Sequence, residues 1–152
     1  MKKLVVIFLI AGFFKISHAQ SLVGRWQEKT FKVSAGYLGN YQFSEDGTFS
    51  YNTNQYFGLG RITGLEGNYN YDAQAHVLSL TVLYINEIVG GTPERSLESG
   101  EATDRWIIGG GKAKKTKLSK PVKAKIKVEF VKSENSDNEL ALFDKMKYYK
   151  VE

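Results

Sequence analysis

The chain has 152 residues, which is the length of one domain rather than two. It has no cysteine, so disulfides, cysteine-bound metals and lipid attachment through a cysteine are excluded. Two prolines, fifteen glycines and frequent aromatic and β-branched residues favour short strands separated by turns.

A basic start and a short apolar run predict a signal peptide at residues 1–19. Lys2 and Lys3 precede the apolar residues 4–14, a run too short to span a bilayer comfortably. Small residues at Ser17 and Ala19 match the positions that a signal peptidase reads. We therefore expect cleavage near Ala19, export to the periplasm or beyond, and one domain at residues 20–152. An uncleaved interfacial anchor is the alternative.

Alternating apolar and polar residues predict eight strands, at about residues 22–33, 37–44, 48–53, 61–71, 76–84, 104–108, 122–131 and 140–151. Asp46-Gly47 between the second and third strands is the strongest hairpin signal in the chain. Gly64 and Gly67 within the fourth strand indicate bulges or a bend. Between these strands we expect a long polar connection at residues 86–103 and a lysine-rich loop from residue 112.

The seventh predicted strand has the clearest alternation. Its inward residues are Val122, Ala124, Ile126, Val128 and Phe130, and lysines fill most positions between them. One solvated face is typical of an antiparallel sheet. Eight such strands form an up-and-down barrel or a sandwich, and we favour the barrel because successive hairpins close it without unpaired edges.

The predicted first strand contains Gly24-Arg25-Trp26, where the glycine permits a close approach and the tryptophan is large enough to plug a small barrel. Together with Gly67-Asn68-Tyr69, Leu140-Ala141-Leu142 and the later Lys147-Tyr148-Tyr149, it gives a chain that resembles the lipocalin-like domains of bacterial secreted proteins. The resemblance implies an all-β, eight-stranded antiparallel up-and-down barrel with Gly24 and Trp26 at its floor. A core tryptophan in a β-sandwich is the alternative.

The chain departs from the lipocalin pattern in one respect. Lipocalins usually place an arginine on the last strand against the tryptophan, but no arginine follows Arg105 here. Lys145 or Lys147 would supply the charge, although lysine does not stack as a planar guanidinium does.

Few residues support catalysis, and we expect no enzyme, no metal and no cofactor. His76 is the only histidine within residues 20–152, and no nucleophile-elbow motif accompanies it. Gly109-Gly110-Gly111-Lys112 lacks the spacing of a phosphate-binding loop. An acidic cluster, whose spacing fits no calcium loop and which we interpret as a solvated segment, consists of Glu94, Glu98, Glu101 and Asp104.

The predicted inward faces suit a small guest molecule. An eight-stranded barrel is either filled by side chains or holds one small ligand. Tyrosines give an apolar wall with polar tips, so we predict a non-catalytic protein that binds a small apolar or amphipathic molecule. The candidate ligand-binding residues are Tyr41, Phe43, Phe49, Tyr51, Tyr69, Tyr71 and Tyr84. Residues 58–60 and 86–103 would form a movable mouth. A barrel plugged by the same aromatic residues is the alternative.

Residues 112–127 contain eight lysines and no acidic residue, although the net charge falls from +5 to +2 once Lys2, Lys3 and Lys15 are removed. Such lysines can simply keep a sheet soluble and its edge unpaired. The alternative function is a module that binds anionic membrane or glycan surfaces. Its candidate residues are Lys114, Lys115, Lys117 and Lys120. Nucleic acid is disfavoured because export removes that partner and no aromatic residues interleave with the lysines.

Overall fold

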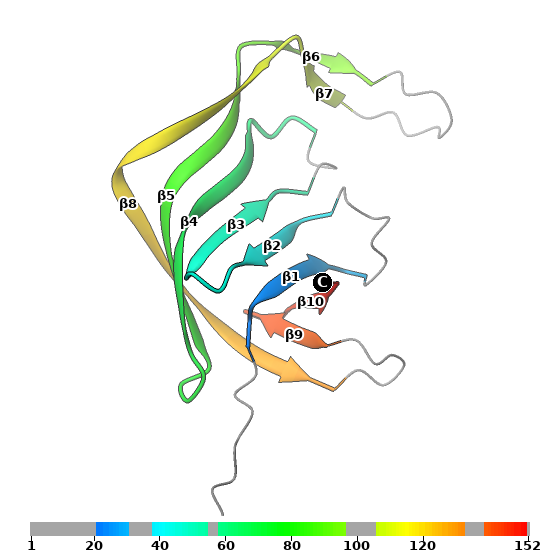
Figure 1. Ribbon diagram of the computed structural model, residues 1–152. Helices are drawn as coiled ribbons and strands as arrows, with labels where there is room; N and C mark the ends of the chain where they lie inside the picture. The colour runs from blue at the N-terminus through cyan, green and yellow to red at the C-terminus, as the bar shows by residue number, and fades with distance from the viewer. Residues whose placement is uncertain (1–20, 31–37, 55–57, 97–105, 133–138, 152) are drawn as a thin grey trace, which may run out of the picture.

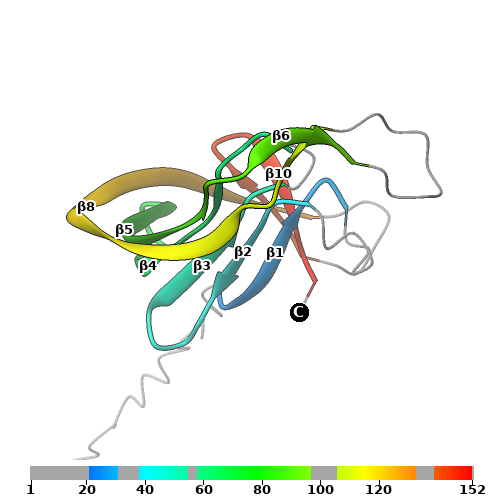
Figure 2. The same ribbon diagram turned by 90° about the horizontal axis from the view of Figure 1, so that it is seen from above.

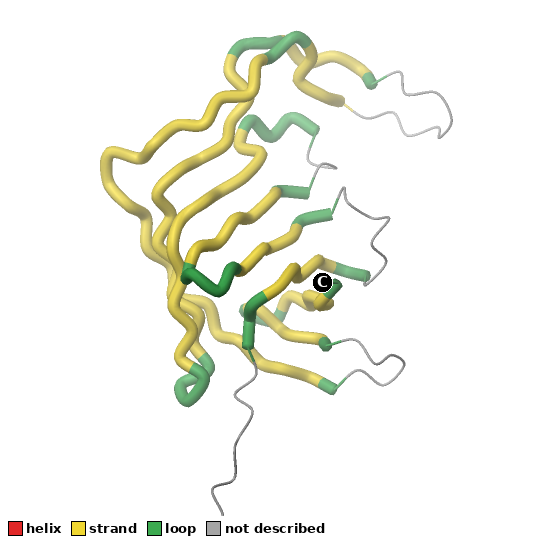
Figure 3. Tube along the Cα trace, viewed as in Figure 1, coloured by secondary structure: helices red, strands yellow, loops and turns green. Residues whose placement is uncertain are grey.

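A computed structural model describes residues 21–30, 38–54, 58–96, 106–132 and 139–151. Within these ranges the regular elements are all strands (Figure 3). The search for a membrane-spanning helix among them finds none. The predicted signal peptide lies outside the described residues, as do Glu98, Glu101 and Asp104 of the acidic cluster.

Eight strands form a closed antiparallel barrel, which confirms the predicted fold class (Figure 1). The barrel strands are β1 (Gly24–Glu28), β2 (Asn40–Phe43), β3 (Thr48–Asn52), β4 (Ile62–Asp72), β5 (Val77–Val89), β8 (Lys112–Val131), β9 (Leu140–Phe143) and β10 (Met146–Lys150). Neighbours around the barrel follow chain order, and β10 pairs with β1 to close it. A separate hairpin of β6 (Thr92–Arg95) and β7 (Trp106–Gly109) is inserted between β5 and β8.

Two of the eight predicted strands were assigned wrongly. Residues 140–151 form two strands, β9 and β10, joined by Asp144 and Lys145, whose φ angles are 47° and 77°. Two consecutive left-handed residues make a tight hairpin turn that usually takes Asn-Gly or Asp-Gly. The lysine in the second position hides this turn from sequence analysis. The strand predicted at residues 104–108 corresponds to β7, which pairs with β6 outside the barrel.

The described parts of the predicted polar connection, residues 86–96, and of the lysine-rich loop are also largely strand, and residues 97–103 of the connection lie outside the described residues. β5 continues to Val89, β8 begins at Lys112, and residues 84–89 pair with residues 112–117. Lys114 and Lys115 lie on opposite faces of β8, so both faces are polar and the period of two disappears from the sequence. Backbone hydrogen bonding to β5 nevertheless keeps this segment extended.

The pairing of β4 with β5 is irregular at Gly64 and Gly67, the two glycines that predicted bulges. The β4–β5 register shifts between Ile62 and Gly64 and again between Glu66 and Gly67. The β5–β8 register shifts between Val82 and Tyr84, and on β8 the paired residues jump from Lys117 to Val122. Seen from above, β8 bends around β5 on the side of the barrel away from β1 (Figure 2). Bulges of this kind increase local twist and re-aim the side chains that follow.

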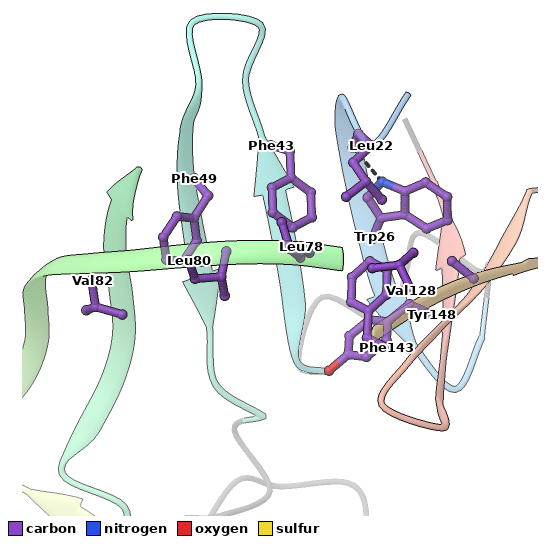
Figure 4. Packing of buried hydrophobic residues seen from close by; sticks show 11 residues of the cluster. Leu22, Trp26, Phe43, Phe49, Leu78, Leu80, Val82, Val128, Phe143 and Tyr148 are labelled. Atoms are coloured by element: carbon purple, nitrogen blue, oxygen red, sulfur yellow. Dashed lines mark hydrogen bonds between the residues drawn. The ribbon is translucent and has the colours of Figure 1, made fainter. Parts of the chain in front are cut away.

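The buried core is built around Trp26, which is 0% exposed. Its indole N–H donates a hydrogen bond of 2.7 Å to the Leu22 carbonyl oxygen (Figure 4). Phe130 and Phe143 each lie 5.9 Å from it, centroid to centroid. Gly24, two residues earlier, has a φ of 120°, a backbone conformation that favours glycine.

The cation near Trp26 comes from Lys150 rather than from Lys145 or Lys147. Lys150 pairs with Trp26 across β1 and β10, and its Nζ lies 5.7 Å from the centroid of the indole ring. Glu139 forms an ion pair with the same ammonium at 3.1 Å. The last strand therefore places a positive charge over the tryptophan face, which its quadrupole attracts.

Candidate functional site

Six of the seven aromatic residues predicted to face inward gather in the barrel interior. They are Tyr41, Phe43, Phe49, Tyr51, Tyr69 and Tyr71. Tyr41 lies opposite Tyr51 in the β2–β3 register, with ring centroids 4.5 Å apart. The Phe43 and Tyr69 rings are 4.8 Å apart, and the Tyr69 hydroxyl donates to the Ser44 carbonyl oxygen at 2.9 Å.

Tyr84 was wrongly placed with them. Because of the bulge after Val82, Tyr84 pairs with Glu66 rather than continuing the inward face of β5. Lys115, which forms an ion pair with Glu66, places its Nζ 4.8 Å from the Tyr84 ring centroid. Tyr84 therefore belongs to an outer polar cluster of β4, β5 and β8.

One side of the interior is filled by packed rings. Phe43 and Phe49 are buried, and Phe143 stacks on Tyr148 with ring centroids 4.8 Å apart. Tyr41 contacts both of these, at 5.6 Å and 5.5 Å. On the side of β1, β2, β9 and β10, the aromatic residues therefore form core rather than the wall of an open space.

The opposite side, along β8, is uncovered. The inward residues of β8 become progressively more exposed from Val128, which is fully buried, through Ile126 and Ala124 to Val122. Val122 is 56% exposed, whereas its register partner Val82 on β5 is 7% exposed. Directly opposed residues share a face of the sheet, so Val122 is an apolar inward residue that the core leaves open to water. We call Val122 and Ala124 the inner β8 wall.

A polar cluster surrounds Glu28, the last residue of β1. Glu28 is 6% exposed, and its Oε1 accepts hydrogen bonds from the Gly39 N–H at 3.1 Å and from the Asn54 amide. A Cβ on Gly39 would stand 3.0 Å from the Tyr51 hydroxyl and 3.1 Å from the Glu28 carboxyl carbon. A hydrogen bond links the Tyr51 and Tyr148 hydroxyls. The inside of the barrel thus has one polar end.

Burial and neighbouring charge hold these tyrosines protonated. Burial raises the pKa of Tyr41 to about 12, with smaller contributions from Tyr51 and Asp144. Burial and then the Glu28 carboxylate raise the pKa of Tyr51. Burial is also the largest cause of the raised pKa of Tyr148, followed by the charges of Tyr41, Tyr51 and Glu28. All three hydroxyls remain hydrogen-bond donors at neutral pH.

We expect this protonation to appear in a tyrosine titration followed by near-ultraviolet absorbance. Tyr41 should ionise only near pH 12, well above the ordinary value of 10 for a tyrosine. Because the pKa of Tyr41 is higher in the folded state than in the unfolded state, Tyr41 contributes to the unfolding free energy. This contribution is complete below pH 10 and is lost as the pH rises through 12. Tyr41→Phe should remove one phenol from the part of the titration above pH 10, to which Tyr51 and Tyr148 also contribute because burial raises their pKa values as well. A titration in which every phenol ionises near pH 10 would contradict the prediction.

The remaining candidates are dispersed. Lys114 pairs with Glu87 on one face of β8, Lys115 and Lys117 point to the other, and Lys120 lies within the bulge. His76 is exposed with a φ of 54°, and its backbone carbonyl accepts the Val128 N–H. Among the residues that the structure describes, no three histidine, aspartate or glutamate side chains gather in a metal-binding arrangement.

Comparisons with known proteins give no match, whether to a family model, to a curated protein or to a solved structure. The functional argument therefore depends on the barrel and on the residues described above.

Proposed function

We propose that the protein is an exported, non-catalytic binding protein of lipocalin-like type. In this proposal it holds one small apolar or amphipathic molecule against the inner β8 wall. The observation that carries the proposal is the exposure of Val122 inside a closed barrel whose opposite side is packed. A guest that removed this apolar surface from water would gain about 25 cal/mol for each Å² buried.

A continuous row of inward residues runs from the polar end across β4 and β5 to β8, where it ends at Thr116 on the other side of the bulge from Val122. Tyr51 pairs with Leu65, Leu65 with Ile85, and Ile85 with Thr116 on β8. Leu65 and Ile85 are only half-buried. The row therefore leads from tyrosine hydroxyls and a carboxylate to apolar side chains, an arrangement that supports an amphipathic guest.

The proposal includes removal of residues 1–19, for which the basic start and small residues at Ser17 and Ala19 are the support. An intact-mass measurement of exported protein tests it. A species that still includes Met1 would contradict signal cleavage without affecting the binding proposal.

The binding proposal is tested first by native mass spectrometry of protein purified from its own host, followed by extraction of any bound molecule. Nile red, a neutral apolar dye, serves as the probe for the purified protein. We expect bound dye to fluoresce strongly and the extracted molecule to displace it. Val122→Lys should weaken dye binding by about tenfold or more, since a buried charge beside an apolar guest is costly.

Val131→Lys is the matched control. Val131 is also exposed, at 40%, and lies on β8, but it falls on the opposite face of the strand from Val128 and Phe130. It should bind the dye as the unmodified protein does. An empty protein that gives no dye fluorescence, or equal losses in the two variants, would overturn the proposal.

A further inference from the structure

The positive charge of the protein is concentrated on one strand. β8 has eight lysines and one glutamate. Lys115 is paired with Glu66 and Lys127 with Glu129. The other six form no ion pair with a residue that the structure describes. They are Lys112, Lys114, Lys117, Lys120, Lys123 and Lys125.

The outer face beside two of these lysines is a regular polar surface. Lys123 pairs with Thr81 on β5, which pairs with Asn68 on β4. Lys125 pairs in the same way with Ser79 and then Asn70. We call these six residues the outer grid. Its strands are about 4.8 Å apart and successive residues on its face about 7 Å apart.

The grid is open to solvent. Both lysines and both asparagines are exposed, and Ser79 and Thr81 are half-buried. β8 forms the outermost wall of the barrel on the side away from β1 and the C-terminus, and no other labelled strand is drawn outside it (Figures 1 and 2).

We infer that the outer grid binds a linear polysaccharide that bears carboxylate or sulfate groups. The lysine ammonium groups complement the acidic groups of such a chain. The asparagine amides and the two hydroxyls both donate and accept hydrogen bonds, as the sugar hydroxyls require. This inference concerns the outside of the barrel and does not depend on the proposed interior ligand.

The composition of the grid favours a polysaccharide over a bilayer. Peripheral membrane binding combines basic residues with apolar side chains that enter the lipid. The grid has no large apolar residue. The exposed Leu59 and Trp106 belong to other segments of the chain, and the exposed Ile62 and Val131 lie at the far ends of β4 and β8, each six residues from the nearest grid residue. The ion pairs Lys115–Glu66 and Lys127–Glu129 leave the unpaired charge of the outer face between them.

The experiment compares two double variants that remove the same charge from the same strand. Lys123→Gln with Lys125→Gln alters the grid. Lys112→Gln with Lys114→Gln alters the opposite face of β8, since Lys114 alternates with the outward Lys115. Calorimetric titrations use heparin as a sulfated probe, alginate as a carboxylated probe and uncharged dextran as the control. All four lysines are exposed, so both variants should fold.

We expect heparin or alginate to bind at low salt and dextran not to bind. The grid variant should lose about tenfold in affinity. It removes two exposed ionic contacts, and each of them is worth at most about fivefold. The opposite-face variant should lose less than about twofold. Asn68→Ala with Asn70→Ala should weaken binding without changing its dependence on salt, which reports ionic contacts.

Three results would overturn the inference. The first is no binding of the unmodified protein to either acidic polysaccharide at low salt. The second is an equal loss of affinity in the two lysine variants, which would show unspecific attraction. The third is binding to vesicles containing phosphatidylglycerol with no binding to the polysaccharides, which would assign the lysines to a membrane surface.

Discussion

We expect Trp26→Ala to lower the unfolding free energy by about 3–5 kcal/mol, the range for emptying a large buried aromatic site. Trp26 is fully buried and contacts rings from β8 and β9. It is also held by the Leu22 carbonyl, which would lose its donor. The surrounding strands close a barrel and cannot collapse inward easily, so most of the cavity would persist.

Urea denaturation followed by circular dichroism measures this effect without relying on tryptophan fluorescence. Trp106→Ala is the matched control because Trp106, the other tryptophan, is 48% exposed and belongs to the β6–β7 hairpin. We expect it to change stability by less than about 0.5 kcal/mol. A Trp26→Ala midpoint that matches the control would show that Trp26 is peripheral to the core.

The cation over Trp26 illustrates what the sequence could and could not locate. The lipocalin pattern calls for an arginine on the last strand, and sequence analysis named Lys145 or Lys147 as its substitute, although Lys150 lies on the same predicted strand. The choice among them depends on register, which depends on the turn at Asp144-Lys145. Once that turn is known, Lys150 falls opposite Trp26, whereas Lys147 pairs with Leu142. Lysine rarely adopts the left-handed backbone conformation, so a lysine at this position does not indicate such a turn in the sequence.

The predicted number of barrel strands was right although two assignments were wrong. Residues 140–151 were predicted as one strand and form two barrel strands, whereas residues 104–108 were predicted as a barrel strand and belong to the β6–β7 hairpin. The two errors offset each other in the total. The long alternating segments were located correctly, because a period of two is a strong signal when one face is buried. Residues 112–117 gave no such signal because lysines occupy both faces of the strand.

The alternation of apolar and polar residues also predicted most of the residues that face the barrel interior. The prediction fails beyond a bulge. Tyr41, Phe43, Phe49 and Tyr51 face inward as expected. Tyr84 does not, because a register shift on β5 reverses every later side chain. Val122 was predicted to face inward, and its register with the buried Val82 agrees, but its exposure of 56% has no signal in the local pattern of the sequence.

Gly67→Ala should lower the unfolding free energy by about 3 kcal/mol, the upper part of the range for overpacking. A Cβ at Gly67 would lie 1.9 Å from the Thr81 carbonyl oxygen and 2.9 Å from its carbonyl carbon. Both are backbone atoms of the neighbouring strand, so no side-chain rotation relieves the clash. The β4–β5 pairing at the bulge has to open instead.

Asn68→Ala is the control for Gly67→Ala, because Asn68 is the next residue of β4 and is exposed on the outer face. We expect that variant to change stability by less than about 0.5 kcal/mol in the same denaturation experiment. Opening β4 from β5 at Gly67 also moves Val82, its register partner and the buried neighbour of Val122. Gly67→Ala should therefore weaken Nile red binding at temperatures where the variant is still folded, whereas Asn68→Ala should not. If Gly67→Ala unfolds at the same urea concentration as the unmodified protein, the close approach of the two strands is relieved at little cost, and the bulge does not constrain the wall.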